Sequence, residues 1–106
     1  MKQTNTAVPN GSKLPLIRYP KSKTIEITFD GTEAREVFIA GDFNQWNPKS
    51  TPMRKDARGV WKRQLRLSSG GHEYRLVVDG QWRDDPHAPA SIANPYGGCN
   101  SFVQVG

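Results

Sequence analysis

Two tryptophans stand in segments that a folded chain tends to expose. Trp46 belongs to residues 41–48, which have the composition of a loop, and Trp82 follows Asp79-Gly80, a strong signal for a tight hairpin turn. Arg75 precedes the same turn, on the opposite face of its strand from the main apolar residues. An indole can cover the C–H face of a sugar ring, while an arginine donates to two hydroxyls at once. This combination predicts non-covalent binding of a neutral, ring-shaped polar ligand such as a pyranose.

Each aromatic ring also has a structural alternative. Trp61 is in phase with the leucines that follow it, and we expect it in the core. Within the 41–48 loop, Phe43 lies closer to the preceding strand, so we expect it to anchor the loop and to leave Trp46 free. For Trp46 and Trp82 the alternative to an exposed platform is burial.

The sequence carries no enzyme signature. It lacks a nucleophile motif, a phosphate-binding loop and zinc-ligand spacing. Asp84, Asp85 and His87 resemble a metal or acid–base group, but no second cluster supplies further ligands, so we expect them to cap turns in solvent. His72 has no evident partner carboxylate, and Cys99 is the only cysteine. We therefore predict no catalytic residue, no metal and no cofactor.

The elements that position these side chains read as short strands separated by turn signals. Residues 35–40 are apolar enough to be covered on both sides, and two prolines exclude regular sheet from residues 83–89. Residues 90–98 read as a loop. Six or seven short strands without a helical period predict an all-β, immunoglobulin-like β-sandwich. The alternating runs are residues 23–29, 60–67, 74–78 and 100–105.

The charge is concentrated in one segment. The net charge is +5, and residues 1–22 contribute four basic side chains and no acid. The remaining 84 residues hold 11 basic and 10 acidic side chains. We predict a flexible basic arm over residues 1–22 and one domain over residues 23–106. Nucleic-acid binding is a minor alternative, because Asp42, Asp79, Asp84 and Asp85 place acidic groups near the exposed aromatic residues.

No run of residues is apolar enough to span a bilayer, and the first six residues lack a signal-peptide core. A single cysteine suits a reducing compartment. We therefore expect a cytoplasmic protein with no membrane partner.

An ordered series of motifs resembles the family 48 carbohydrate-binding modules. Within that family it is most similar to the glycogen-binding domain of the AMP-activated protein kinase beta subunit and to the early-set N-terminal domains of isoamylases and branching enzymes. The resemblance covers about residues 23–106, and the series is more specific than any one motif. The motifs are residues 41–46, residues 59–61, residues 72–82 with Asp85-Pro86, and residues 100–105.

The resemblance implies an early-set β-sandwich that binds α-1,4-linked glucan, such as glycogen, a starch-like polymer, maltooligosaccharide or cyclodextrin. By motif, Trp46 and Trp82 correspond to two stacking platforms, and Asn100 to a ligand-binding asparagine. Arg75 stands where the family has a lysine that reaches sugar hydroxyls. Tyr96 falls near the position of a leucine that enters the helical glucan. The last two residues depart from the family pattern.

We therefore predict non-catalytic glucan binding that targets a partner protein to the polymer. Many repeated sites on one glucan would compensate for a weak single site. The alternative is a protein-interaction scaffold with a degenerate sugar site.

Overall fold

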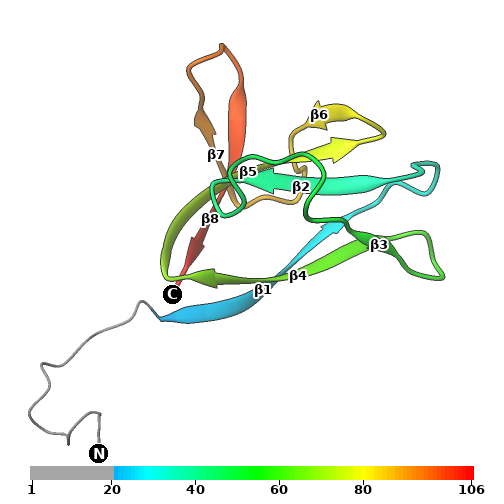
Figure 1. Ribbon diagram of the computed structural model, residues 1–106, viewed down its shortest axis with the longest axis horizontal. Coiled ribbons are helices and arrows are strands. Elements are labelled where there is room, and N and C mark those ends of the chain that lie inside the picture. Colours follow the sequence, from blue (N-terminus) through cyan, green and yellow to red (C-terminus); the bar gives the residue numbers. More distant parts are fainter. Residues whose placement is uncertain (1–20) are drawn as a thin grey trace, which may run out of the picture.

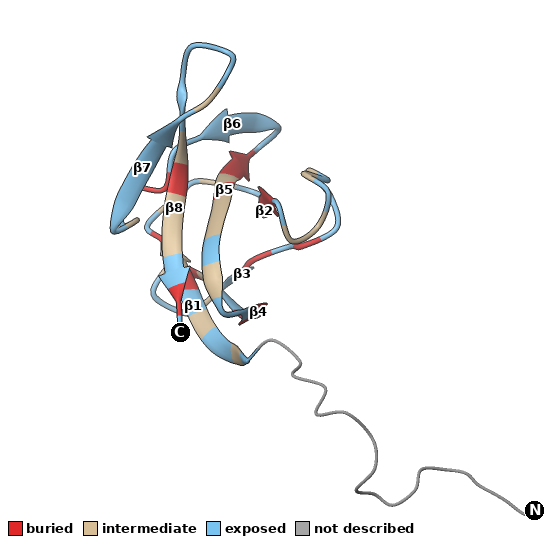
Figure 2. Cartoon of the chain, turned by 90° about the vertical axis from the view of Figure 1, so that its left-hand side faces the viewer, coloured by how far each residue is buried: buried red, intermediate tan, exposed pale blue. Residues whose placement is uncertain are grey.

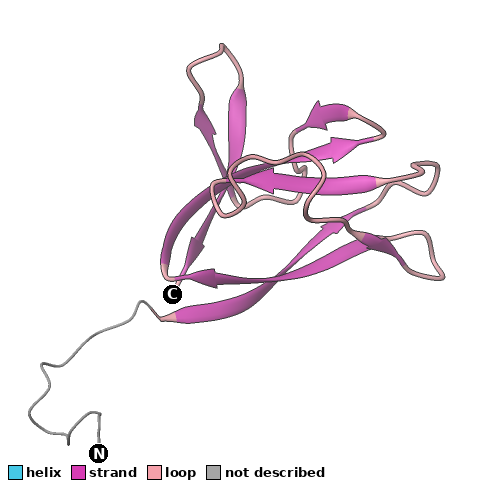
Figure 3. Ribbon diagram, viewed as in Figure 1, coloured by secondary structure: helices cyan, strands magenta, loops and turns pink. Residues whose placement is uncertain are grey.

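The computed structural model describes residues 21–106, which form eight strands and no helix (Figures 1 and 3). No helix in this part of the chain could therefore cross a membrane. The arm predicted over residues 1–22 lies outside the described residues, apart from Lys21 and Ser22, and Ser22 already begins β1. The strands are β1 (Ser22–Phe29), β2 (Val37–Gly41), β3 (Arg54–Lys55), β4 (Trp61–Ser68), β5 (Gly70–Val78), β6 (Gln81–Arg83), β7 (Ala90–Ala93) and β8 (Cys99–Val105).

The strands form two antiparallel sheets. One has the order β1-β4-β3, and the other has the order β2-β5-β8-β7, with β6 paired to β5. Only Ser69 separates β4 from β5, so the chain passes directly from one sheet to the other. Gly70 and Gly71 already belong to β5. The all-β sandwich predicted from the spacing of the strands is confirmed.

The core lies between the inner faces of the two sheets (Figure 2). On β5 the inner residues are Tyr74, Leu76 and Val78, as the alternation predicted. Trp61 on β4 belongs to the same core, and its Nε1–H donates to the carbonyl of Gly31 at 2.8 Å. This bond satisfies the one polar group that the buried indole carries, so the structural role predicted for Trp61 is confirmed.

The hairpin between β5 and β6 has the predicted two-residue turn. Asp79 and Gly80 have φ values of 50° and 83°, and Val78 pairs with Gln81. The Asp79 carboxylate accepts the backbone N–H groups of Glu36 and Arg35, which lowers the pKa of this carboxyl. These bonds explain why β2 begins at Val37 and not at residue 35: the two preceding amides are used by the turn.

Two strand predictions are partly wrong. The prolines predict no regular sheet over residues 83–89, but Arg83 is the last residue of β6. Residues 90–98 were expected to be a loop, but Ala90–Ala93 form β7, which pairs with β8 at the edge of the sheet. All four residues of β7 are exposed, so the strand has no buried face that could produce an alternating pattern.

Val77 is buried although it lies on the outer face of β5, because Phe38 on β2 and Trp82 on β6 flank it in the register.

The expectation that Asp85 is solvated is also wrong. Asp85 is buried, and its Oδ2 accepts the hydroxyl of Tyr74 at 2.5 Å. Burial, followed by the contact with this carboxylate, raises the pKa of the Tyr74 hydroxyl. The other carboxylate oxygen accepts the backbone N–H of His87, and the amide of Asp85 donates to Ser101 Oγ. The irregular segment after β6 is thus attached to β5 and β8 through one buried side chain.

Replacing Tyr74 with Phe tests this attachment. The variant leaves a buried carboxylate oxygen without its donor, so we expect the free energy of unfolding to fall by about 1–3 kcal/mol. Urea denaturation measures the change. Tyr96→Phe is the matched control, because Tyr96 is 93% exposed. Equal stability of both variants would contradict a structural role for the Tyr74–Asp85 bond.

Candidate functional site

The outer face of the β2-β5-β8-β7 sheet carries a hollow of about 670 Å³. All five side chains predicted to form a site line it, although they come from three strands, β5, β6 and β8, and from two loops, after β2 and after β7. These are Trp46, Arg75, Trp82, Tyr96 and Asn100. Four further residues line the hollow that were not predicted as site residues: Asp42, Glu73, Asn94 and Pro95.

The alternation of β5 places two of these side chains. Tyr74 and Leu76 point into the core, so Arg75 between them leaves the sheet on the outer face. Val77 lies on that same face and pairs with Trp82 on β6. Directly opposed residues of an antiparallel pair share a face, so the indole of Trp82 stands beside Arg75. Trp82 is 45% exposed and is therefore not part of the core.

Trp46 reaches the hollow from the loop after β2. Both Gln45 and Trp46 have a φ of 57°, a left-handed conformation that costs about 1–3 kcal/mol in a bulky residue. The backbone N–H of Trp46 donates to the carbonyl of Gly41 at 2.9 Å and closes the loop. The indole thus depends on a strained backbone that neighbouring bonds must stabilise.

Asn44 supplies most of those bonds. Its Oδ1 accepts the amide of Gly41 at 3.0 Å, and its Nδ2 donates to the carbonyl of Ile39 and to Thr51 Oγ1, both at 2.9 Å. Phe43 packs against the core and anchors the loop, as predicted. Asn44 therefore ties the start of the loop to the end of β2 and to the segment before β3. Sequence analysis missed this function, because an asparagine in a loop usually indicates only a turn.

Asn100 and Tyr96 are positioned by a second group of amides. Asn100 Nδ2 donates to Glu73 Oε1 at 3.0 Å, and Asn100 Oδ1 accepts Nδ2 of Asn94 at 3.2 Å. Asn94 Oδ1 in turn accepts the backbone N–H groups of Tyr96 and Gly98. The loop that carries the highly exposed Tyr96 is therefore connected through Asn94 to Asn100 on β8 and Glu73 on β5.

Acidic groups outnumber basic ones around the hollow. Arg75 is paired with Asp84 at 3.0 Å, and Asp42 and Glu73 also line the site. The Nε of Arg75 is buried and has no acceptor within residues 21–106. Of the four aspartates expected beside the aromatic residues, Asp42 lines the hollow and Asp84 pairs with Arg75. Asp85 is buried elsewhere, and Asp79 lies at the hairpin turn.

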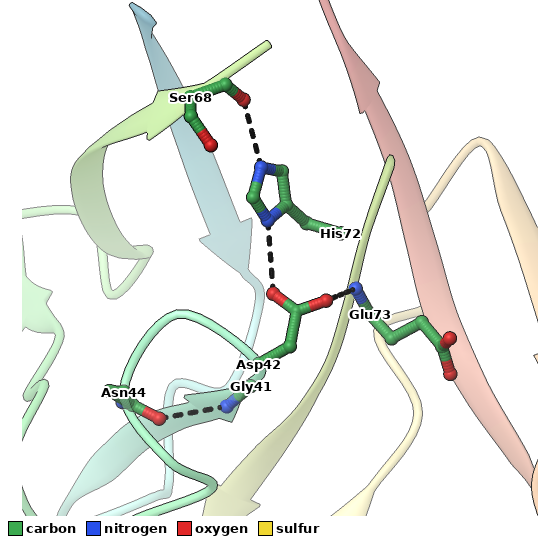
Figure 4. A network of polar contacts seen from close by, with 6 residues as sticks. All are labelled: Gly41, Asp42, Asn44, Ser68, His72 and Glu73. Carbon is green, nitrogen blue, oxygen red and sulfur yellow. Dashed lines mark hydrogen bonds and ion pairs between the residues drawn. The ribbon is translucent and has the colours of Figure 1, made fainter. Parts of the chain in front are cut away.

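His72 has the carboxylate partner that sequence analysis did not find. Its Nδ1 lies 2.9 Å from Asp42 Oδ1, and its Nε2 lies 2.8 Å from the carbonyl oxygen of Ser68 (Figure 4). Burial lowers the pKa of His72, but the bonds to Asp42 and Ser68 outweigh it and raise the pKa above 6.5. Asp42 lies 30 positions away in the sequence, so only the pairing of β2 with β5 brings the two together. The described residues contain no group of three His, Cys, Asp or Glu side chains suited to a metal ion.

Comparison with known proteins shows to which family this chain belongs. Residues 23–106 match the family described as the glycogen recognition site of AMP-activated protein kinase. The chain belongs to this family. This membership confirms the resemblance found in the motifs and makes the chain a glycogen-recognition domain of the carbohydrate-binding type.

The relatives of this glycogen-recognition domain are longer proteins. The beta-2 subunit of 5'-AMP-activated protein kinase from Mus musculus is 38% identical over 71 residues, 67% of this chain and 25% of that subunit. The beta-1 subunit from Sus scrofa is 34% identical over 71 residues, 67% of this chain and 55% of that protein. Protein PTST homolog 2, chloroplastic, from Arabidopsis thaliana is 36% identical over 63 residues, 59% of this chain and 12% of that protein. The match thus spans a quarter of the mouse subunit's length.

Replacing Asn44 with Ala tests whether this side chain stabilises the Trp46 loop. The change leaves three backbone or hydroxyl partners unpaired, so we expect a loss of roughly 1–3 kcal/mol in stability. Hydrogen exchange at the Trp46 amide should also become faster. Asn47→Ala is the matched control, because Asn47 is exposed and its side chain accepts only the amide of Lys49. Unchanged exchange in Asn44→Ala would contradict the assignment.

Proposed function

We propose that this domain binds α-1,4-linked glucan without catalysis, with Trp46 and Trp82 as stacking platforms and Arg75, Tyr96 and Asn100 as their partners. The observation that carries the proposal is that two tryptophans from separate elements open onto one hollow on the outside of the sheet. Membership of a glycogen-recognition family supports the choice of ligand.

The size of the stacking contribution follows from area. Covering one face of a glucose unit on an indole removes ~50–100 Å² of apolar surface, which is worth roughly 1–2.5 kcal/mol before entropy. Two such contacts and a few hydrogen bonds make a weak single site once association costs are included. A polymer with many repeated sites would raise the apparent affinity of any assembly that carries several such domains.

The polar groups suit hydroxyls better than anions. Arg75 brings guanidinium donors to the hollow, and Glu73 and Asp42 bring carboxylate acceptors. A neutral sugar can donate to the carboxylates and accept from the guanidinium. The phosphates of a nucleic-acid backbone can only accept hydrogen bonds, and their negative charge would meet the acidic groups of this face. The lining therefore favours a neutral glucan over a polyanion.

The proposal also includes a partner protein that the domain brings to the polymer, and a cytoplasmic location. The relatives that match this chain carry additional length, which agrees with a targeting role inside a larger assembly.

Incubation of pure protein with glycogen should release no reducing sugar. Measurable release would overturn the non-catalytic part of the proposal.

Alanine variants of the two tryptophans test the platforms. We expect Trp46→Ala and Trp82→Ala each to weaken binding about tenfold, because each removes one stacked surface. Retention on insoluble amylose and a fluorescence titration with β-cyclodextrin measure the loss. An unchanged urea midpoint shows that the fold is intact. Wild-type affinity in both variants would overturn the proposal. A flat titration of the wild type would favour the alternative, a protein-interaction scaffold with a degenerate sugar site.

A pair of arginine variants tests the polar contact. Arg75→Ala should weaken glucan binding about tenfold, because charge-assisted donors to sugar hydroxyls are lost. Arg63 is exposed on the other sheet and donates to the carbonyl of Pro52, so Arg63→Ala should bind like the wild type. Calorimetric titration with maltoheptaose compares the two. An equal effect of both substitutions would mean that general charge, and not the position of Arg75, matters.

A further inference from the structure

Both ring nitrogens of His72 face hydrogen-bond acceptors. One is the carboxylate of Asp42 and the other is the backbone carbonyl of Ser68 at the end of β4 (Figure 4). A neutral imidazole has one N–H and can donate to only one of them. The doubly protonated ring donates to both, so this arrangement fits the imidazolium form.

Asp42 connects His72 to the hollow that forms the candidate glucan site. Its second carboxylate oxygen accepts the backbone N–H of Glu73 at 2.8 Å, and its own amide donates to the Glu73 carbonyl at 3.0 Å. Asp42 lines the hollow and opens the loop whose strained turn carries Trp46. His72 also meets the ring of Phe43, the loop's anchor, edge-on at 6.3 Å between centroids. His72 is therefore in contact with both residues that begin this loop.

We propose that His72 is a positioning residue for glucan binding: in its protonated form it holds Asp42, and through Asp42 the Trp46 loop, in the shape that the sugar meets. This inference rests on the proposed function of the hollow. Loss of the proton leaves a ring lone pair facing an acceptor, which breaks one of the two bonds and loosens the loop.

The groups around His72 set the direction of the effect. Asp42 from the loop is the carboxyl partner, β4 contributes a neutral carbonyl, and β8 places Val103 opposite His72. The net result of burial and these bonds is a pKa above the ordinary value of 6.5. Affinity for a neutral glucan should therefore be highest at low pH and should fall as the pH rises through this pKa.

The ionisable groups that line the hollow are carboxyl groups, one guanidinium and one phenol, and such groups do not ordinarily titrate near the pKa of a histidine. Carboxyl groups ordinarily titrate below about pH 5 and phenols above about pH 9. The other histidine of the chain is His87, which pairs with Asp30 and does not line the hollow. The two histidines thus form a matched pair for substitution.

The experiment compares wild type, His72→Gln and His87→Gln in calorimetric titrations with β-cyclodextrin between about pH 5.5 and pH 8.5. We expect the affinity of the wild type and of His87→Gln to fall about threefold to tenfold across this range. His72→Gln, which cannot titrate, should show a flat profile. Binding in buffers of different ionisation enthalpy should reveal proton uptake by the wild type and by His87→Gln.

The outcomes separate this inference from the proposed function. A flat wild-type profile with normal binding, or a sloping profile in His72→Gln, overturns the role of His72 alone. Loss of the slope in His87→Gln assigns the effect to the wrong histidine and also overturns it. No binding at any pH overturns the proposed function itself. If His72→Gln fails to fold, the absence of proton uptake by the wild type is sufficient to reject the inference.

Discussion

Strand β5 pairs with three other strands, and this pairing places the strand residues of the candidate site. β2 lies on one side of it, and β8 and β6 share the other side. The inner face of β5 supplies Tyr74, Leu76 and Val78 to the core, so its outer face must present the residues between them. A shift of one residue in register would exchange the two faces and would remove the site and the core together. The same burial that stabilises the sandwich therefore orients Arg75 and, through β6, Trp82.

Trp46 is positioned by a different physical principle. No sheet holds it, and its backbone is left-handed, so the loop depends on the hydrogen bonds that Asn44 makes to the end of β2 and Asp42 makes to Glu73 on β5. Strain of this kind persists only where the surroundings determine the conformation. One tryptophan is thus held by regular pairing and the other by a small network of polar contacts. The second arrangement is the one that a change in protonation can alter.

The polar groups of the hollow are largely bonded to one another before any ligand arrives. Asn100 contacts both Glu73 and Asn94, and Arg75 contacts Asp84. Such preorganisation lowers the entropy that a ligand must overcome on ordering these side chains. It also gives the Arg75 guanidinium a carboxylate partner beside an exposed apolar surface. A neutral ligand with many hydroxyls can join these bonds without breaking them.

The sequence by itself determined the all-β class, the inner face of β5, the Asp79-Gly80 turn and the core position of Trp61. Each follows from local alternation or from turn chemistry, which act over a few residues. The same local reasoning missed β7, whose four exposed residues carry no periodic signal, and the burial of Asp85. Only the tertiary structure decided which distant groups meet: His72 with Asp42, Tyr74 with Asp85, and Asn100 with Glu73. Such contacts depend on strand pairing and loop closure between separate segments, and no local pattern in the chain records them.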